Sequence, residues 1–372
     1  MTNRAAGYKA HLEALGVQWI GWRGAEVAGS FGDVQAEYEA VREGCVGLAD
    51  RSERELLVIG GDDAVSWLQG LLTNDLFALA EEGSGQWSCA VGTTGRLIAD
   101  LRLLHLPDML LADLEAGVLG ENLLGHLRRH VIMEKVKLTD RSEQTARIGL
   151  YGQKAAEVLA AAGELARGLD GLADYHGTWG VIGEEDVVVQ KIALVGEPGF
   201  EISCAVEGAL AVWKALEAAG GAAAGGAGLR PIGHEALERL RIEAGIPRFG
   251  VELDEKVIPL EAGMYETISF KKGCYLGQEI IARLDTLGTP ARVLRAVVLE
   301  SAAVPGTDAE LSVAKKSVGK VVSATFSRAL GKPVALAYIK RGFNAVGDSV
   351  EIDGVVGRVH ALGTLPMVRD RA

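Results

Sequence analysis

The sequence predicts an α+β protein that carries a separate small β-barrel at its C-terminal end. The 372 residues are more than one hydrophobic core usually organises, so we expect several domains. Strand-like and helix-like runs follow one another in the first three quarters of the chain. After Pro290 the runs are strand-like, short and separated by turn residues. We therefore expect a first region over 1–289, built of two interleaved subdomains, and a barrel over 290–372.

Hydrophobic periodicity and glycine-rich breaks define the elements of the first region. The apolar run 56–59 ends at Gly60-Gly61, and Asp62 or Asp63 is a suitable N-cap for the helix that follows. That helix ends near Thr73-Asn74-Asp75. Further strands are expected at 97–103, 109–114, 147–151, 187–195 and 200–205, and further helices at 35–43, 118–129, 155–167, 210–220 and 234–244.

The barrel is predicted from four runs rich in β-branched residues, at 293–299, 318–326, 334–339 and 349–359. Asp353-Gly354 interrupts the last run and is a strong signal for a two-residue hairpin.

The net charge and the distribution of apolar residues argue against two classes of function, nucleic-acid binding and a role within a membrane. A net charge of −12 opposes unaided binding to a phosphate backbone, so direct nucleic-acid binding is disfavoured. The N-terminus lacks the apolar core of a secretory signal, and no run of about 18 apolar residues occurs. We therefore expect a cytoplasmic protein with no membrane segment.

The cysteines and histidines do not indicate a metal site. The four cysteines are scattered without a C-x-x-C pair, and for Cys45, Cys89 and Cys204 we expect small buried thiols. His126 and His130 are four residues apart and could chelate a metal. They lack the glutamate of H-E-x-x-H and a nearby third ligand, so a polar helix face is the simpler interpretation.

The segment 271–279 combines lysines, glycines, a cysteine and other polar residues that are typical of functional loops. Its sequence is Lys271-Lys272-Gly273-Cys274-Tyr275-Leu276-Gly277-Gln278-Glu279. Its glycines allow a tight turn or a close approach of the backbone to a partner. Glu279 and Arg283 are four residues apart, with the acidic residue first, which favours a helix. We expect a turn followed by a short helix.

This segment resembles the signature of the YgfZ-like folate-binding family, a relative of the aminomethyltransferase (T protein) of the glycine cleavage system. In the T protein an acidic residue stands where this chain has Cys274. Three other segments resemble the T-protein superfamily, namely Leu72-Thr73-Asn74-Asp75, Gly196-Glu197-Pro198-Gly199-Phe200-Glu201-Ile202 and Leu240-Arg241-Ile242-Glu243-Ala244-Gly245. The resemblance implies an aminomethyltransferase-like folate-binding fold, in which antiparallel sheets and helices surround a central channel.

The resemblance also implies a set of residues around tetrahydrofolate or a derivative of it. Asp75 would face the folate channel, although a turn or C-cap aspartate is the alternative. Glu197 would accept two parallel N–H donors of a pterin ring, unless it is a solvated turn residue. Lys272, Gln278 and Glu279 would complete the ligand loop, and Tyr275 could join them, although core packing is the simpler interpretation for Tyr275.

Cys274 is the candidate reactive residue beside Asp75. Flanked by two lysines and near a helix N-terminus, its thiol should ionise more readily than an isolated one. One thiol does not hold an iron–sulfur cluster, since clusters generally need four ligands. The alternative is a buried packing residue in a glycine turn.

Two departures from the aminomethyltransferase pattern weaken the transfer of that activity to this chain. An Arg-Asp pair precedes the Leu-Arg-x-Glu run in aminomethyltransferases, and this chain has Leu237-Glu238 there. Leu194 stands where an aromatic residue is expected shortly before the Glu197 turn. These changes remove a planar cation and a stacking face from a folate site.

Three functions are consistent with these residues. The leading hypothesis is a tetrahydrofolate-binding auxiliary protein that supports the synthesis or repair of iron–sulfur enzymes, including those that thiolate tRNA. Its partners would be folate and iron–sulfur client enzymes or assembly proteins. The alternative is a folate-dependent aminomethyltransferase or a related one-carbon transferase. A third possibility is a folate-fold relic that serves only as a binding scaffold.

Overall fold

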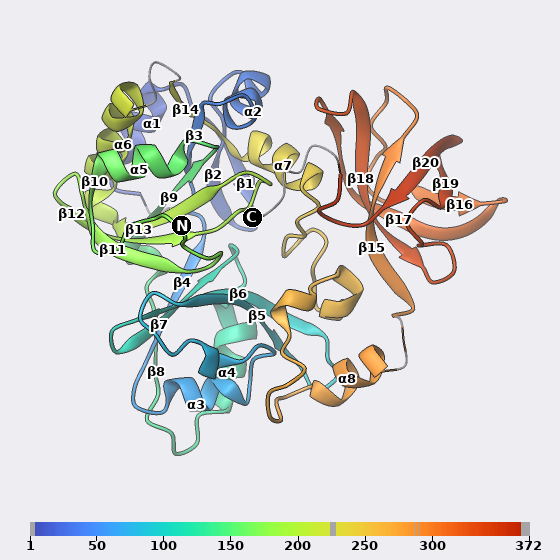
Figure 1. The fold of residues 1–372 in the computed structure, drawn as a ribbon, viewed down its shortest axis with the longest axis horizontal. Helices are drawn as coiled ribbons and strands as arrows, with labels where there is room; N and C mark the ends of the chain where they lie inside the picture. Colours follow the sequence, from blue (N-terminus) through green and yellow to red (C-terminus); the bar gives the residue numbers. More distant parts are fainter. Residues whose placement is uncertain (1–3, 224–227, 287, 289, 366–372) are drawn as a thin grey trace.

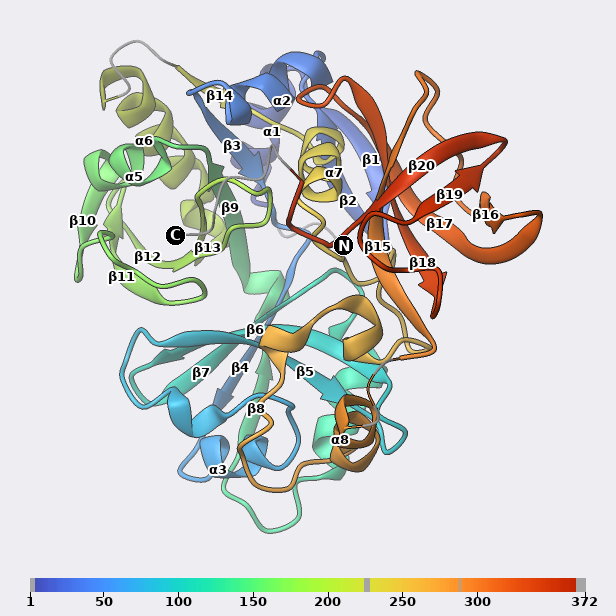
Figure 2. The ribbon, with the colours of Figure 1, turned by 45° about the vertical axis from the view of Figure 1, so that its right-hand side comes forward.

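The computed structural model describes residues 4–223, 228–286, 288 and 290–365. Figure 1 shows three lobes, and a view turned by 45° separates the same three lobes (Figure 2). One lobe is built on a seven-stranded sheet, one on a five-stranded sheet and one is a closed six-stranded barrel. The α+β class with a C-terminal barrel, predicted from the sequence, is confirmed.

The seven-stranded sheet has the order β10-β11-β12-β13-β9-β3-β14, and helices α1, α5 and α6 pack on one of its faces. Apolar residues of strands and helices meet in this core, among them Tyr8, Leu150 and Trp213, which are fully buried. The strands are β3 (Val46–Asp50), β9 (Thr145–Tyr151), β10 (Gly163–Leu165), β11 (Gly177–Ile182), β12 (Glu185–Lys191), β13 (Gly199–Ala205) and β14 (Leu229–Pro231). The helices are α1 (Ala6–Ala14), α5 (Ala155–Ala162) and α6 (Ala209–Ala223).

The five-stranded sheet has the order β5-β6-β7-β4-β8. Residues Leu97, Leu101 and Leu103 of β6 point to the face that is covered by α3 and α4, as the alternating pattern predicts. The elements are β4 (Glu55–Gly60), α3 (Ala64–Gln69), β5 (Gly85–Val91), β6 (Leu97–Leu106), β7 (Met109–Leu114), α4 (Gly125–Arg129) and β8 (Lys137–Asp140).

The other face of the five-stranded sheet meets the seven-stranded sheet. Arg147 of β9 forms an ion pair of 2.8 Å with Asp113 of β7, and Gln190 of β12 donates a hydrogen bond of 3.1 Å to the carbonyl of Leu103. Both faces of β6 are therefore buried, and charged side chains on its second face lie between two sheets.

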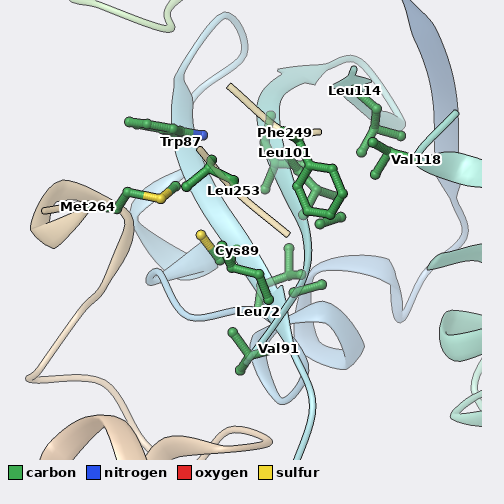
Figure 3. Packing of buried hydrophobic residues seen from close by; sticks show 14 of the residues in the cluster. Leu72, Trp87, Cys89, Val91, Leu101, Leu114, Val118, Phe249, Leu253 and Met264 are labelled. Carbon is green, nitrogen blue, oxygen red and sulfur yellow. The ribbon is translucent and has the colours of Figure 1, made fainter. Parts of the chain in front are cut away.

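The core of the five-stranded sheet continues into the segment after α7 (His234–Glu243) and into the barrel. Figure 3 shows Trp87, Leu253 and Met264 in the same cluster as Leu72 and Cys89. Cys89 and Cys204 are buried, as expected, whereas Cys45 is half-buried.

The barrel closes in the order β15-β18-β17-β16-β19-β20. Asp353 and Gly354 both have positive φ angles, of 51° and 79°, which is the backbone geometry of a tight two-residue hairpin. The strands are β15 (Arg292–Leu299), β16 (Glu310–Val313), β17 (Lys316–Ser327), β18 (Lys332–Lys340), β19 (Ser349–Ile352) and β20 (Val355–His360).

The remaining elements connect these lobes. β1 (Gln18–Trp22) and β2 (Ala25–Ser30) form a separate hairpin, and α2 (Val34–Arg42) packs against α7. Short 3-10 turns occur at Leu76–Ala78, Ser142–Gln144, Val206–Gly208, Pro259–Ala262 and Tyr265–Thr267. Helix α8 (Gln278–Thr286) begins at the end of the 271–279 segment, so the predicted turn and helix are confirmed.

Several predicted helix boundaries were wrong. The helix expected at 118–129 is a π-helical segment, Leu119–Leu124, with a kink at Gly120, followed by α4. The helix expected at 155–167 ends at Ala162, because the chain turns there into edge strand β10. Asp63 occupies the N-cap position of α3, but its carboxylate accepts from the backbone N–H of Lys135 instead, at 2.7 Å.

Within the described residues, no helix is both long and apolar enough to cross a membrane.

Candidate functional site

A cavity of about 340 Å³ lies where the three lobes meet. Its walls come from β5 and β6, from the segment before β11 and the segment after β12, from the residues after α7, and from the chain that follows the barrel. The lining residues are Trp87, Arg102, Tyr175, Ile192, Ala193, Leu194, Ala244, Gly245, Ile246, Pro247, Ala262, Gly263, Met264, Glu266, Leu362 and Gly363.

An inner chamber of about 40 Å³ adjoins this cavity, because the two share Arg102, Leu194, Ile246 and Pro247. Charged residues are more frequent in the lining of the chamber than in that of the cavity. Its other lining residues are Arg51, Arg54, Glu115, Val195, His234, Leu237, Glu238, Arg241 and Arg248.

Asp100, on β6, is not itself among the lining residues but is hydrogen-bonded to one of them, Trp87. It is 8% exposed, and its Oδ2 atom accepts a 3.0 Å hydrogen bond from the indole N–H of Trp87 on β5. Burial raises the pKa of Asp100, against the opposing effects of Arg102 and of the Trp87 hydrogen bond. A buried carboxylate with a perturbed pKa next to a cavity is a typical functional-site feature.

Arg102 is two residues further along β6 and therefore points to the same face of the sheet as Asp100. Its Nη1 atom is 3.3 Å from Oδ2 of Asp113. The same carboxylate also pairs with Arg54, at 2.7 Å, and with Arg147, at 2.8 Å. Burial alone would raise the pKa of Asp113, but these arginines outweigh it and lower that pKa to about 2.

Ion pairs hold the wall of the inner chamber in place. Arg248 bridges Glu115, at 2.8 Å, and Glu238, at 2.7 Å, and its guanidinium lies 4.2 Å from the ring centroid of Trp22. Burial and the Arg248 charge lower the pKa of His234 to about 4, so its ring is neutral at pH 7.

Arg241 connects the chamber to the barrel. It pairs with Glu238 and with Glu252, both at 2.7 Å, and Glu252 also accepts from the hydroxyl of Ser323 on β17. Buried pairs of this kind fix the relative position of the elements that carry them, since breaking one leaves an uncompensated charge.

The predicted carboxylates Asp75 and Glu197 lie outside the lining of the cavity and of the chamber. Asp75 is half-buried and caps a 3-10 turn, where it accepts from the N–H of Phe77 and from the amide of Gln69. Glu197 is buried and pairs with Arg42 of α2, at 3.0 Å.

The predicted ligand loop also lies outside these linings. Lys272 is buried and its Nζ atom donates to the carbonyls of Leu72 and Asn74, at 2.8 and 2.7 Å. Burial lowers its pKa to about 8, with Asp75 opposing the shift. The loop and the Asp75 segment therefore meet, whereas Glu197 is paired elsewhere.

The other loop residues differ in exposure. Cys274 is exposed, and Tyr275 is buried in the core with its ring 5.1 Å from Nζ of Lys272. Gln278 is half-buried and Glu279 is exposed in the first turn of α8. None of these four residues lines the cavity, and their roles as site residues stay predictions.

Asp100, Arg102 and Trp87, which lie at or next to the cavity, were not among the residues predicted from the sequence. A signal was present, because the strand expected at 97–103 carries an aspartate and an arginine two residues apart, in alternation with its leucines. Leu194, Leu237 and Glu238, which depart from the aminomethyltransferase pattern, do lie in the walls of the cavity or chamber.

Comparison with known proteins identifies the family. Residues 8–272 match the GCVT N-terminal domain, and residues 292–367 match the glycine cleavage T-protein C-terminal barrel domain. A protein named aminomethyltransferase from Symbiobacterium thermophilum is 31% identical over 351 residues, which are 93% of this chain and 91% of the relative. One from Bacillus subtilis is 29% identical over 345 residues, 91% of each chain.

A solved structure supports the fold. The glycine cleavage system aminomethyltransferase T from Bartonella henselae superposes with a TM-score of 0.85, covering 98% of each chain at 22% identity.

These findings correct the leading functional hypothesis. The auxiliary role toward iron–sulfur enzymes, with its client partners, was wrong, because the relatives over nearly the whole chain are named aminomethyltransferases. That hypothesis rested on Cys274, whose side chain is exposed and does not line the cavity. The chain belongs to the glycine cleavage T-protein family.

Proposed function

We propose that this protein is a folate-dependent aminomethyltransferase or a closely related one-carbon transferase. It would move a methylene carbon from an aminomethylated lipoyl carrier to tetrahydrofolate. The bonds from that carbon to sulfur and to the amino nitrogen break, two bonds to folate nitrogens form, and a thiol and ammonia leave. The observation that carries the proposal is the buried carboxylate of Asp100, held by Trp87 beside the central cavity.

The residues of the cavity fit a reduced folate. A volume of about 340 Å³ lies within the range of small-molecule sites, which are typically about 300–1,000 Å³. The rings of Trp87 and Tyr175 have centroids 6.2 Å apart, and Met264 adds a polarizable apolar surface. Asp100 and Arg102 supply an acceptor and a donor for the polar edge of a flat ring.

Tetrahydrofolate would supply the nucleophilic nitrogen atoms that receive the carbon. Asp100 would accept a hydrogen bond from a ring N–H and stabilise positive charge that develops there, and Trp87 would fix the orientation of the carboxylate. The buried position of both residues would strengthen these interactions by excluding water.

Glu197 would act as a positioning residue behind the wall. It holds Arg42, which also pairs at 3.0 Å with Glu243, the last residue of α7. Ala244 and Gly245 follow directly and line the cavity. Lys272 would support the wall similarly, through the 72–75 and 264–268 segments that pack against β5.

The 271–279 segment bears on the placement within the family. Its resemblance to the YgfZ-like signature supports a position in that branch, on the motif alone.

The test measures ammonia. Purified protein, an aminomethylated lipoyl carrier and tetrahydrofolate should together release ammonia, and omission of the folate should slow the release. Asp100→Asn should lower the rate by about 100-fold or more, since the charge is lost and the shape is kept. Asp75→Asn is the matched control, and its folded fraction should retain most of the activity. No ammonia from folded native protein, or equal losses in both variants, would contradict the proposal.

A further inference from the structure

Arg102 places a positive charge in the cavity wall that its neighbours compensate only in part. Within the described residues its ion-pair partner is Asp113, at 3.3 Å through Nη1. Asp113 is closer to Arg54 and to Arg147, at 2.7 and 2.8 Å, so three guanidinium groups share this carboxylate. Arg54 has a second partner, Glu115, at 3.0 Å. Arg102 makes the longest of the three contacts and uses only Nη1 for it, so its other N–H donors have no ion-pair partner among the described residues.

The position of Arg102 directs those donors to the ligand space. Arg102 lines both the cavity and the inner chamber. Arg54 lines only the chamber, and Arg147 lines neither. The side chain of Arg102 is 10% exposed. In the sheet register it stands opposite Trp87 on one neighbouring strand and opposite Asp113 on the other.

Asp100 and Arg102 together form a pair of opposite hydrogen-bonding character. A carboxylate accepts and does not donate, whereas a guanidinium donates and does not accept. Their spacing of two residues puts both on one face of β6. The reduced pterin ring has a matching edge, on which the N5–H donor and the O4 carbonyl acceptor lie side by side.

We propose that Arg102 is a specificity-determining residue that donates to the 4-oxo group of a tetrahydropterin while Asp100 accepts from the neighbouring ring N–H. This inference rests on the proposed function for its ligand, and it goes further by assigning selectivity for 4-oxo over 4-amino pterins. A 4-amino group would present N–H toward a guanidinium that can only donate, and it would leave a buried donor unpaired.

The experiment compares tetrahydrofolate with tetrahydroaminopterin, which differs from it only by an amino group in place of the 4-oxo group. Binding is measured by anaerobic calorimetry on the full-length protein. The native protein should bind tetrahydrofolate about 10- to 100-fold more tightly, since an unpaired buried donor has a cost of that size. Arg102→Gln should bring the ratio of the two affinities close to one, because a side-chain amide can present either a donor or an acceptor.

Arg147→Gln is the matched control. It removes another guanidinium from the same Asp113 carboxylate, but Arg147 is not among the residues that line the cavity or the chamber. This variant should keep the native selectivity even where both affinities fall. Arg102→Lys retains a donor and should retain part of the preference, which provides a second variant if the glutamine substitution prevents folding.

Three results would overturn the proposal: an equal affinity of the native protein for the two pterins, binding of neither, or a selectivity that Arg102→Gln and Arg147→Gln reduce equally. The last result would assign Arg102 a purely structural role. The ammonia assay is independent of this ratio. Absence of ammonia release with selectivity intact would therefore reject the transfer reaction and leave the role of Arg102 standing.

Discussion

The indole N–H of Trp87 donates a 3.0 Å hydrogen bond to Oδ2 of Asp100, across two adjacent antiparallel strands. The bond joins an aromatic wall of the cavity to the carboxylate that lies beside it. It also favours the charged form of Asp100, against the burial that disfavours that form. The balance of these two effects sets the pH range in which the carboxylate is ionised.

Trp87→Phe should shift the activity of the protein to higher pH. Loss of the hydrogen bond removes an interaction that lowers the pKa of Asp100, so that pKa rises and ionisation requires a higher pH. In the pH profile of ammonia release, the acidic limb of kcat/KM should move up by as much as about one pH unit. A profile that coincides with the native one would contradict this role for Trp87.

Trp67→Phe is the control for that experiment. Trp67 also donates an indole hydrogen bond, which is partly buried and 2.7 Å long, but to the carbonyl of His130 and not to a titrating group. Both substitutions should lower the free energy of unfolding by about 1–3 kcal/mol. Only Trp87→Phe should move the acidic limb.

Asp100→Asn should stabilise the protein at pH 8 while it reduces activity. Burial raises the pKa of Asp100, so the folded state binds its proton more tightly than the unfolded state does. The corresponding stability is present at low pH and is lost as the pH rises through the folded pKa. A neutral asparagine avoids this loss, so the free energy of unfolding at pH 8 should be higher in the variant than in the native protein.

Urea unfolding at pH 8 and pH 4 would measure this gain, which should shrink at the lower pH. Asp113→Asn should have the opposite effect and lower the free energy of unfolding at pH 8. The folded pKa of Asp113 is lowered to about 2, so its stabilising effect is present above the unfolded pKa near 4 and is lost below it. Removing this buried charge should cost about 3–5 kcal/mol at pH 8. Destabilisation by both variants at pH 8 would contradict the assignment for Asp100.

Cys274 should be the first thiol to react with a maleimide in the native protein. It is exposed, whereas Cys45 is half-buried and Cys89 and Cys204 are buried. Because Cys274 does not line the cavity, saturating tetrahydrofolate should leave its labelling rate unchanged. Mass spectrometry of labelled peptides over time would test both statements, and strong protection by folate would place the thiol at the ligand.

The local elements that sequence patterns predicted well are those in which neighbouring residues decide the structure. The leucine alternation in β6, the Asp353-Gly354 hairpin and the glycine turn before α8 all depend on the backbone and side-chain preferences of a few adjacent residues. The helix predicted over 155–167 ends early, because residues Gly163–Leu165 pair with β11. That strand lies outside the predicted helix, so the helical pattern carries no information about the pairing.

In the candidate site, too, features set by neighbouring residues could be predicted and features set by tertiary contacts could not. Asp75 and Glu197 were chosen because they stand in recognisable motifs, and each proves to be bonded within its own surroundings, one to a 3-10 turn and the other to Arg42. Asp100 stands in an ordinary-looking strand. Its importance follows from the seven-stranded sheet, which covers that face of β6 and removes its charged residues from water.

By itself, the sequence determined the α+β class, the terminal barrel and the resemblance to a folate-binding superfamily, because these follow from periodicity, turn chemistry and short motifs. The tertiary structure alone decided which carboxylate lies beside the central cavity and which arginine lines it. Burial, ion pairing and the shift of a pKa arise from residues far apart in the chain, and no local pattern encodes their distances.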